Sequence, residues 1–335
     1  MSASVYNEPL SRAQQRQAFL AKHGYAPEYC SLLAADASPR QYYRWQYEGK
    51  SLVLMDTPIS EKPEQFCRIS QLLRDINLSA PEIVVYDFDQ GFLLLEDLGD
   101  QTYTRALTSD NTTALYTLAI KTLIHLHQHQ LQKVDFVDCY TSKELLREAM
   151  LFLEWYYPEI EGKKPSLEAI QQYESVFYDA FTTALAQQPH RLVLRDYHID
   201  NLILLSSREG IQRCGLLDFQ CALWGPIGYD VVSLLEDARR DVDPFLKEQL
   251  WQVYGAAFPE LNLEILRQSS AVLSVGRHLK ILGIFMRLAI RDGKKEYLAH
   301  LPRIERLLKI SLAEANLPDL TLWFKTYMSH LSHAN

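Results

Sequence analysis

The stretch from Leu192 to Leu205 reads LVLRDYHIDNLILL. Two apolar runs, each suited to a buried strand, enclose a short segment with two aspartates, an arginine, a histidine and an asparagine. Burying an isolated carboxylate costs free energy unless a partner group or a metal ion meets it. The segment is therefore either a charged surface turn or a functional site, and the rest of the chain must decide between them.

The bulk composition is that of a globular protein. With 335 residues, of which 47% are hydrophobic, the chain can form two packed units or one large one, and general disorder is excluded. The net charge of -8 argues against a nucleic-acid partner held mainly through its phosphates. It does not exclude nucleotide binding, which needs only a local cluster of donors and cations.

Cysteine usage and hydropathy bear on the compartment. The five cysteines are scattered, odd in number and without metal-ligand spacing, which predicts reduced packing residues of a cytosolic protein. The N-terminal segment lacks the apolar region of a signal peptide, and no apolar run approaches the roughly 18 residues needed to cross a bilayer. We therefore expect a soluble cytoplasmic protein with no membrane partner.

Residues 1–98 have the pattern of a small strand-rich lobe. Ser11 and Gln14 have capping-box spacing and predict a helix from Ser11 to His23. Strands are expected near 29–34, 41–47 and 51–55, followed by a helix within 63–78 and two further strands within 82–88 and 91–98. This order predicts a sheet with one intervening helix.

Residues 99–335 have mainly helical periodicity. Helices are expected at 113–130 and 167–186, and the chain from Asp230 to the end also has a helical pattern. A further helix should begin at a cap at Thr141 and end at Pro158. The opening stretch and residues 214–224 interrupt them as a short strand–loop–strand insertion. The predicted fold class is α+β, with a small antiparallel sheet lobe (1–98) and a larger, mainly helical lobe (99–335).

Three residues in and after the opening stretch have the inventory of a phosphoryl-transfer site. Such a reaction needs a carboxylate that orients the attacking hydroxyl and oxygen ligands for the Mg²⁺ ion that bridges the phosphates. Asp196 and Asn201 lie in one loop, and Asp218 follows the next apolar run. Each residue alone would more often be a solvated turn residue, but the combination is far more specific.

The motif RDYHIDN resembles the catalytic loop of protein-kinase-like phosphotransferases, and LLDFQ resembles their metal-binding segment. Within this superfamily the chain is most similar to the aminoglycoside phosphotransferase-like group. It resembles most closely the bacterial kinases that phosphorylate N-acetylmuramate and N-acetylglucosamine at C1 during cell-wall recycling. Supporting stretches span nearly the whole chain: DASPRQYYR, LVLMDTP, GFLLLEDLGDQTY, LLDFQCALWGPIGYDVVSLLEDARRDV and RHLKILGIFMRLAIRDGK.

The resemblance implies a two-lobed kinase-like fold that uses ATP and Mg²⁺. Asp196 would be the catalytic base, Asn201 and Asp218 would be Mg²⁺ ligands, and Arg195 would help to hold the loop. Asp230 resembles the buried aspartate that anchors the catalytic loop. Its plainer reading is an ordinary helix N-cap, and both roles can hold at once.

On the nucleotide side, the segment AADASPR takes the place of a phosphate-covering loop, although it contains no glycine. Ser38 would donate to phosphate and Arg40 would supply charge; the alternative is a hairpin loop with a surface arginine. The third strand lacks the lysine of protein kinases, so Arg40 and Arg44 are the candidates to neutralise the ATP phosphates. Glu96 and Leu98 would contact the purine through main-chain atoms.

The acceptor side is read from scattered residues. His198 either contacts the substrate or satisfies a loop carbonyl, and Trp224 either stacks on a sugar ring or packs beside a turn. A cation such as Arg277, Lys280, Arg287 or Arg291 would suit the carboxylate of N-acetylmuramate, although these residues span several faces of the expected helix. A polycationic acceptor would instead require a cluster of acids, for which the candidates are Glu236, Asp237, Asp241 and Asp243; the alternative is a solvated face of mixed charge.

Three functions therefore stay open at this point. The first is an ATP-dependent kinase acting on the anomeric hydroxyl of an amino sugar. The second is a phosphotransferase for aminoglycosides or other hydroxylated small molecules. The third is an ATP-binding protein without transferase activity, which the missing lysine keeps possible.

Overall fold

The computed structural model describes residues 10–35, 40–129 and 131–331. The chain divides into two compact units. The first, called here the N-terminal unit, comprises the described part of Met1–Gln101 together with Ile203–Gln220. The second, the C-terminal unit, comprises Thr102–Leu202 and the described part of Cys221–Asn335. One unit is built on an antiparallel sheet and the other mainly on helices, which confirms the predicted α+β class.

The sheet of the N-terminal unit has the strand order β1-β2-β3-β5-β4, and every neighbouring pair is antiparallel. Between β2 and β3, Glu48 and Gly49 have φ angles of 49° and 76°. Two central residues with positive φ form the tight hairpin turn that matches the twist of the strands. The strands are β1 (Cys30–Ala35), β2 (Gln41–Tyr47), β3 (Lys50–Asp56), β4 (Ile83–Asp87) and β5 (Phe92–Glu96).

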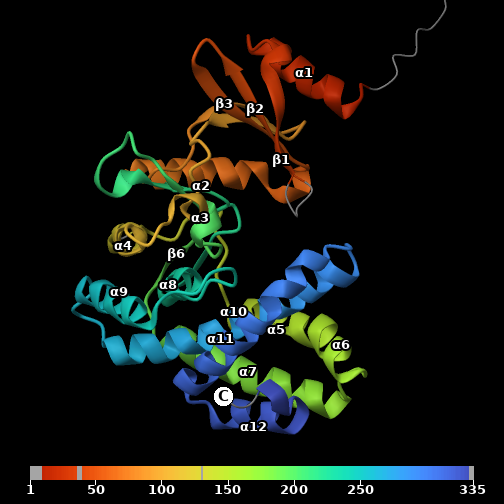
Figure 1. Ribbon diagram of the computed structural model, residues 1–335, viewed down its shortest axis with the longest axis vertical. Helices are drawn as coiled ribbons and strands as arrows, with labels where there is room; N and C mark the ends of the chain where they lie inside the picture. The colour runs from red at the N-terminus through yellow and green to blue at the C-terminus, as the bar shows by residue number, and fades with distance from the viewer. Residues whose placement is uncertain (1–9, 36–39, 130, 332–335) are drawn as a thin grey trace, which may run out of the picture. The chain divides into compact units, whose positions relative to one another are not determined.

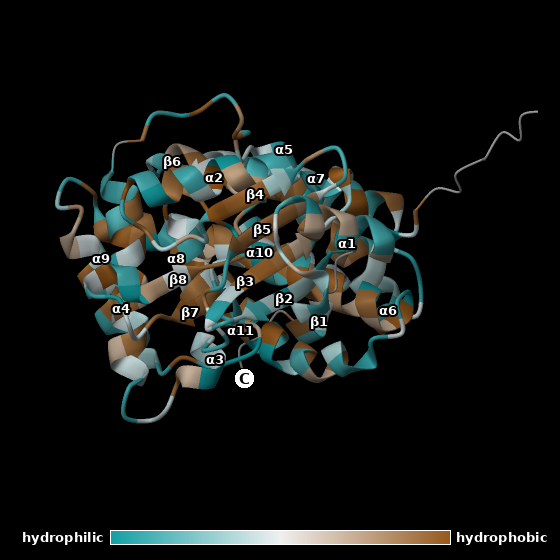
Figure 2. Cartoon of the chain, turned by 90° about the horizontal axis from the view of Figure 1, so that it is seen from above, coloured by the Kyte–Doolittle hydropathy of each residue, from teal (hydrophilic) through white to brown (hydrophobic). Residues whose placement is uncertain are grey.

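Two helices accompany this sheet. Helix α1 (Arg12–Lys22) begins with the capping box expected at Ser11 and Gln14, and Figure 1 shows it beside the strands. It buries Phe19 and Leu20 against a cluster that includes residues of β3 and of β5, whose apolar ribbon is visible in Figure 2. Helix α2 (Pro63–Asp75) buries one apolar face at helical spacing, as its periodicity predicts.

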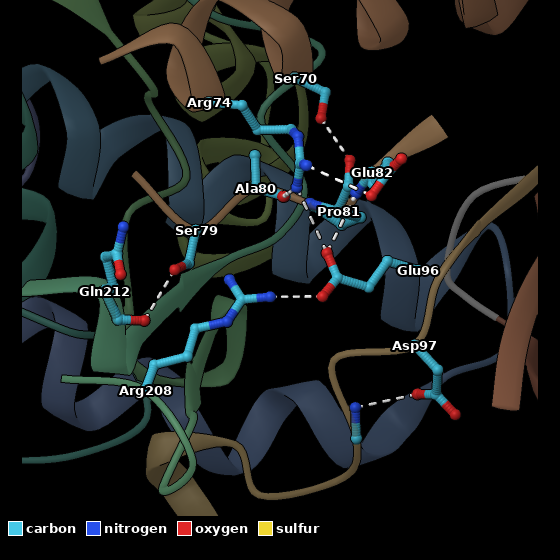
Figure 3. A network of polar contacts seen from close by, with 11 residues as sticks. Ser70, Arg74, Ser79, Ala80, Pro81, Glu82, Glu96, Asp97, Arg208 and Gln212 are labelled. Carbon is cyan, nitrogen blue, oxygen red and sulfur yellow. Dashed lines mark hydrogen bonds and ion pairs between the residues drawn. The ribbon is translucent and has the colours of Figure 1, made fainter. Parts of the chain in front are cut away.

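Residues 203–220 complete the N-terminal unit, although they follow it by a hundred residues in the chain. Strand β7 (Leu202–Leu204) pairs with β8 (Cys214–Leu216). The backbone N–H of Leu216 donates to the carbonyl of Ser79 at 2.9 Å. Figure 3 shows the second bond, in which the Ser79 hydroxyl donates to the carbonyl of Gln212 at 2.7 Å. Hydrogen bonds therefore fasten this hairpin to the segment between α2 and β4.

The C-terminal unit surrounds the long helix α10, whose side chains are buried on nearly every face. A short ladder of β6 with β9 lies in the same unit. The helices and strands are α3 (Tyr103–Ala106), α4 (Thr112–Gln128), α5 (Ser142–Leu151), α6 (Tyr157–Glu161), α7 (Leu167–Ala186), β6 (His190–Val193), β9 (Leu223–Pro226), α8 (Gly228–Leu235), α9 (Pro244–Ala256), α10 (Leu263–Ile290), α11 (Leu301–Ala315) and α12 (Pro318–Tyr327).

Pro158 does not stop the helix that Thr141 caps, which corrects the sequence reading. After α5 the chain forms a π-helical segment, η3 (Phe152–Tyr156), and then continues as α6 with Pro158 in its first turn. The wider π turn and the start of a new helix both dispense with the backbone N–H that proline lacks. The helical stretch therefore ends only at Gly162, whose φ is 65°.

All five cysteines are free thiols. Cys214 is buried, but Cys139 and Cys221 are exposed, so the predicted packing role is wrong for these two. Across the described residues, none of the helices combines the length and the apolar character that a membrane span requires.

Gly283 of α10 lets this helix approach α5 closely. A Cβ at position 283 would lie 2.4 Å from the carbonyl carbon and oxygen of Leu151, which are backbone atoms and cannot move aside. We expect Gly283→Ala to lower the free energy of unfolding by about 1–3 kcal/mol, despite the better helix propensity of alanine. Urea denaturation checks this.

Gly255→Ala in α9 is the matched control. A Cβ there would lie 2.8 Å from the end of the Leu263 side chain, which can rotate away. We expect this variant to keep or gain stability. Equal effects of the two substitutions would show that close helix approach at Gly283 does not limit stability.

Candidate active site

The segment between β6 and β7 is a compact loop in the C-terminal unit. The N–H of Asp196 donates to the carbonyl of Leu194 at 2.9 Å, around Arg195 with a φ of 71°. The N–H of Asn201 then donates to the carbonyl of His198 at 2.9 Å. A three-residue turn with positive φ at a side chain as large as arginine is rare and strained. This turn sets the position of Asp196 at the start of the loop.

Asp230 of α8 holds this strained turn from inside the C-terminal unit. Its two carboxylate oxygens accept from the N–H groups of Leu194 at 2.6 Å and Arg195 at 2.8 Å. The residue is fully buried, and burial raises the pKa of Asp230 to about 7, while the two amide donors and the charge of Arg277 oppose the rise. Asp230 lies within α8 and not at its N-cap, and its oxygens accept hydrogen bonds from the loop instead.

The side chain of Arg195 turns away from the loop into a buried charge cluster. Its guanidinium pairs with Glu148 of α5 and donates to the carbonyl of Cys221 at 3.0 Å. Glu148 also lies 3.1 Å from the ammonium of Lys280 and accepts from the hydroxyl of Tyr140 at 2.5 Å. One buried carboxylate therefore positions two cations beside the loop.

The charge of Asp196 follows from these neighbours. Burial by itself raises the pKa of Asp196, but the positive charges of Lys280, Arg277 and Arg195 outweigh it and lower the pKa below the ordinary value. The carboxylate is therefore ionised at neutral pH, as a group that orients a hydroxyl and accepts its proton must be.

The side-chain amide nitrogen of Asn201 is used within the loop. Its Nδ2 donates to the carbonyl of Asp196 at 2.9 Å and lies 3.3 Å from His198 Nε2. Because the nitrogen is used by the loop, Oδ1 points the other way, and no donor to it occurs among the described residues. A neutral oxygen ligand of this kind suits Mg²⁺.

Asp218 lies in the N-terminal unit, just after β8, with a φ of 55°. The next residue, Phe219, stacks on Phe66 of α2 with ring centroids 4.8 Å apart. The Oδ1 atom of Asp218 accepts from Gln220 at 2.7 Å and from Arg40 at 3.2 Å. The stacked ring and these donors fix the carboxylate in a strained backbone conformation.

Arg40 is a buried cation that joins two carboxylates. It is 5% exposed, lies 3.2 Å from Asp218 and pairs with Glu61 at 2.9 Å. Glu61 lies in the short turn before α2, and nothing in the sequence singles it out. No local pattern marks Glu61, because its partner is a side chain twenty-one residues earlier.

The other nucleotide candidates have different surroundings. The guanidinium of Arg44 is taken up by Asp97 at 2.7 Å and Asp100 at 2.7 Å. Leu98 is buried in a small apolar cluster with Ile203 and Leu205. Ser38 lies outside the described residues.

The carboxylate of Glu96 is held between Arg208, with which it pairs, and Arg74, at 3.4 Å (Figure 3). Its backbone N–H donates to the carbonyl of Glu82 at 2.8 Å. Both the side chain and the N–H of Glu96 are therefore committed within the N-terminal unit.

The acceptor candidates all lie in the C-terminal unit. His198 is 8% exposed, and its Nδ1 has no hydrogen-bond partner within the described ranges. Burial lowers the pKa of His198, against the charge of Asp237, which raises it. Arg277 is 5% exposed, and its Nε likewise lacks a partner there. Trp224 is half-buried in β9, opposite Leu192 of β6.

Glu148 is the residue of this cluster that the sequence reading missed. The signal was available in part, since Glu148 shares the buried face of α5 with Leu145 and Ala149. A carboxylate on the apolar face of a helix indicates a buried partner. That Glu148 meets both Arg195 and Lys280 could not be read from the pattern.

Comparison of the sequence with known proteins identifies the family of this chain. The model of the phosphotransferase enzyme family matches residues 30–263. The N-acetylmuramate/N-acetylglucosamine kinase of Pseudomonas aeruginosa is 36% identical, over 84% of this chain and 82% of that protein. The protein of the same name from Caulobacter vibrioides is 30% identical, over 95% of this chain and 97% of that protein. The chain belongs to the phosphotransferase enzyme family, which confirms the family predicted from the two motifs.

Solved structures agree on the fold. An ADP-bound aminoglycoside phosphotransferase has a TM-score of 0.60 and 14% identity, over 90% of this chain and 98% of that one. An ethanolamine kinase from Plasmodium vivax has a TM-score of 0.62 and 12% identity, over 93% of this chain and 92% of that one. These neighbours confirm the kinase-like phosphotransferase fold.

The role of Asp230 can be tested through its two acceptor oxygens. Asp230→Asn replaces one of them with a donor that faces a buried N–H of Leu194 or Arg195. We expect a loss of about 1–3 kcal/mol in the free energy of unfolding, because one buried amide is left unsatisfied. Urea denaturation measures the loss, and turnover should fall with it as the loop loosens.

Ser233→Ala on the same helix is the control. The Ser233 hydroxyl makes only a long bond of 3.3 Å to the carbonyl of Arg195. Its removal should cost little in stability or turnover. An Asp230→Asn protein as stable as this control would contradict the anchoring role.

Proposed function

We propose that this chain transfers the γ-phosphate of ATP to the anomeric hydroxyl of N-acetylmuramate and N-acetylglucosamine. The observation that carries the proposal is a catalytic-type loop with an ionised Asp196, in a chain related over most of its length to kinases named for these two sugars. The reaction would serve recycling of cell-wall amino sugars in the cytoplasm, where ATP is available.

In this reaction Asp196 would orient the anomeric hydroxyl and accept its proton as the bond to phosphorus forms. An anomeric hydroxyl is more acidic than an ordinary alcohol, so a carboxylate with a lowered pKa is a sufficient acceptor. Help of this kind is worth about 10²–10⁴-fold in rate. Arg195 would act indirectly, by fixing the loop through Glu148.

Asn201 and Asp218, one in each unit, carry side-chain oxygens of the kind that Mg²⁺ binds. Asn201 would provide Oδ1, whose amide nitrogen is already used by the loop, and Asp218 would provide its carboxylate. Both are oxygen ligands of the type that Mg²⁺ prefers. Bound Mg²⁺ would neutralise charge on the phosphates of ATP. Among the described residues, no group of three or more histidine, cysteine, aspartate or glutamate side chains suited to a metal occurs.

Arg40 would replace the lysine that the third strand lacks. It is buried, it pairs with Glu61 near the start of α2, and it lies beside the proposed metal ligand Asp218. Arg44 is the weaker candidate, because Asp97 and Asp100 already surround its guanidinium.

Two further nucleotide contacts complete the proposal. The loop with Ser38 would cover the phosphates. The purine would meet the carbonyl of Glu96, whose N–H is committed to Glu82, and the N–H of Leu98.

The surroundings of Asp196 disfavour a polycationic acceptor. Arg277 and Lys280 both place positive charge near this carboxylate. An aminoglycoside would be repelled there, whereas a neutral or anionic sugar would be accepted. A buried cation at Arg40 also weakens the case for a protein without transferase activity.

The test is phosphorylation of a sugar and aminoglycoside panel with Mg²⁺-ATP, followed by phosphorus NMR. We expect sugar 1-phosphate from N-acetylmuramate and N-acetylglucosamine. Asp196→Asn should bind ATP as the wild type does and lose about 10²–10⁴-fold in turnover, because the proton acceptor is gone.

Asp200→Asn is the control in the same loop, since Asp200 is tied to Thr104 and Arg239 and is assigned no catalytic role. Its turnover should stay within a few-fold of wild type. Phosphate at a non-anomeric position would reject the proposed acceptor, and full activity of Asp196→Asn would reject the proposed base.

Arg40→Met tests the source of positive charge for the phosphates. We expect the KM for ATP to rise about tenfold or more, since a charged hydrogen bond is worth about 1.5–3 kcal/mol. Steady-state kinetics with varied ATP measures this. The parallel variant Arg44→Met should mainly lower stability. A larger rise in KM for Arg44→Met than for Arg40→Met would reverse the assignment.

A further inference from the structure

Several side chains of the C-terminal unit have buried polar atoms without a hydrogen-bond partner in the described ranges, and Arg277, Asp237 and His198 are among them. These three residues are 5%, 1% and 8% exposed. The Nε of Arg277, the Oδ2 of Asp237 and the Nδ1 of His198 have no hydrogen-bond partner within the described part of the chain. Buried polar atoms are nearly always paired in folded proteins, so a group of unpaired ones calls for a ligand that supplies the missing partners.

These side chains surround the loop that carries Asp196. The charges of Asp237, Asp196 and Arg277 all act on the imidazole of His198, which places the four groups in one neighbourhood. Arg277 lies one helical turn before Lys280 on α10, and Lys280 is positioned by Glu148 beside Arg195. Arg277 and Lys280 therefore both lie near the loop that carries Asp196.

Arg277 and Lys280 of α10 differ in one respect. Lys280 has a carboxylate partner in Glu148, whereas the Nε of Arg277 has no hydrogen-bond partner in the described ranges. The charge of Arg277 acts on the carboxylates of Asp196 and Asp230, and its planar fork matches a carboxylate in shape and charge. The Nε of Arg277 is therefore available to an anion from outside the chain.

The two proposed acceptors differ in the same respect. N-acetylmuramate carries a lactyl carboxylate and N-acetylglucosamine carries none, while both have ring hydroxyls and an acetamido N–H. An unsatisfied carboxylate oxygen such as Oδ2 of Asp237 suits the donors that they share.

Building on the proposed function, we propose that Arg277 binds the lactyl carboxylate of N-acetylmuramate and that Asp237 accepts a hydrogen bond from a donor common to both sugars. Arg277 is then the residue that sets the preference between the two acceptors. Asp237 serves both alike.

The experiment compares kcat/KM for the two sugars in one preparation of enzyme. In Arg277→Met the ratio of kcat/KM for N-acetylmuramate to that for N-acetylglucosamine should fall about 10- to 100-fold, because only one sugar loses a charged contact. Arg277→Lys should retain part of the ratio. Asp237→Asn should lower both values and leave the ratio within a few-fold of wild type.

Arg287→Met is the matched control. It removes a cation from the same helix about 15 Å further along, and its ratio should equal that of wild type. The methyl ester of N-acetylmuramate, tested on the wild-type enzyme, requires no variant to fold. On the wild-type enzyme, kcat/KM for the ester relative to N-acetylglucosamine should fall by the same factor as the ratio falls in Arg277→Met.

The outcomes separate the subsite from the proposed function. Suppose that the wild type is active but Arg277→Met keeps the wild-type ratio, or that the methyl ester reacts as well as N-acetylmuramate. Either result overturns the carboxylate contact and leaves the proposed function in place. An equal fall for both sugars in Arg277→Met also overturns it and indicates a contact with the transferred phosphoryl group. A wild type that phosphorylates neither sugar overturns the proposed function as well.

Discussion

The buried carboxylate of Asp230 is the constraint on which the catalytic-type loop depends. Its two oxygens accept from consecutive backbone amides, those of Leu194 and Arg195, and so hold a turn whose φ of 71° would otherwise be unfavourable. Helix α8 can present Asp230 there because Gly228, near its start, packs without a side chain against Gln188 and Ser270. The position of Asp196 is thus decided by helix packing beneath the loop.

A single carboxylate, that of Glu148, holds two cations beside this loop. Glu148 takes Arg195 and Lys280, so two cations stay beside Asp196 although both are largely buried. Their positive charge offsets the desolvation of Asp196 and keeps it ionised. The charge of Arg277 adds to the same field. The proposed role of Asp196 as a proton acceptor requires this ionised state.

The N-terminal unit also contains buried cations that are paired with carboxylates. Where a strand lysine is absent, Arg40 reaches both Glu61 and Asp218 from the end of the β1–β2 connection. Arg44 is neutralised by two aspartates. The carboxylate of Glu96 is shared by Arg74 and Arg208, which ties residues 203–220 to the sheet (Figure 3). One buried cation therefore meets two carboxylates within the N-terminal unit.

The sequence alone determined the family, the fold class and most elements, because hydrophobic periodicity, caps such as Ser11 and the spacing of Asp196, Asn201 and Asp218 are local properties of the chain. The tertiary structure alone decided the pairings of Glu148 and Glu61 and the packing of residues 203–220 with the N-terminal unit. These contacts join residues far apart in sequence, and their energies depend on burial and on charges that no local pattern contains.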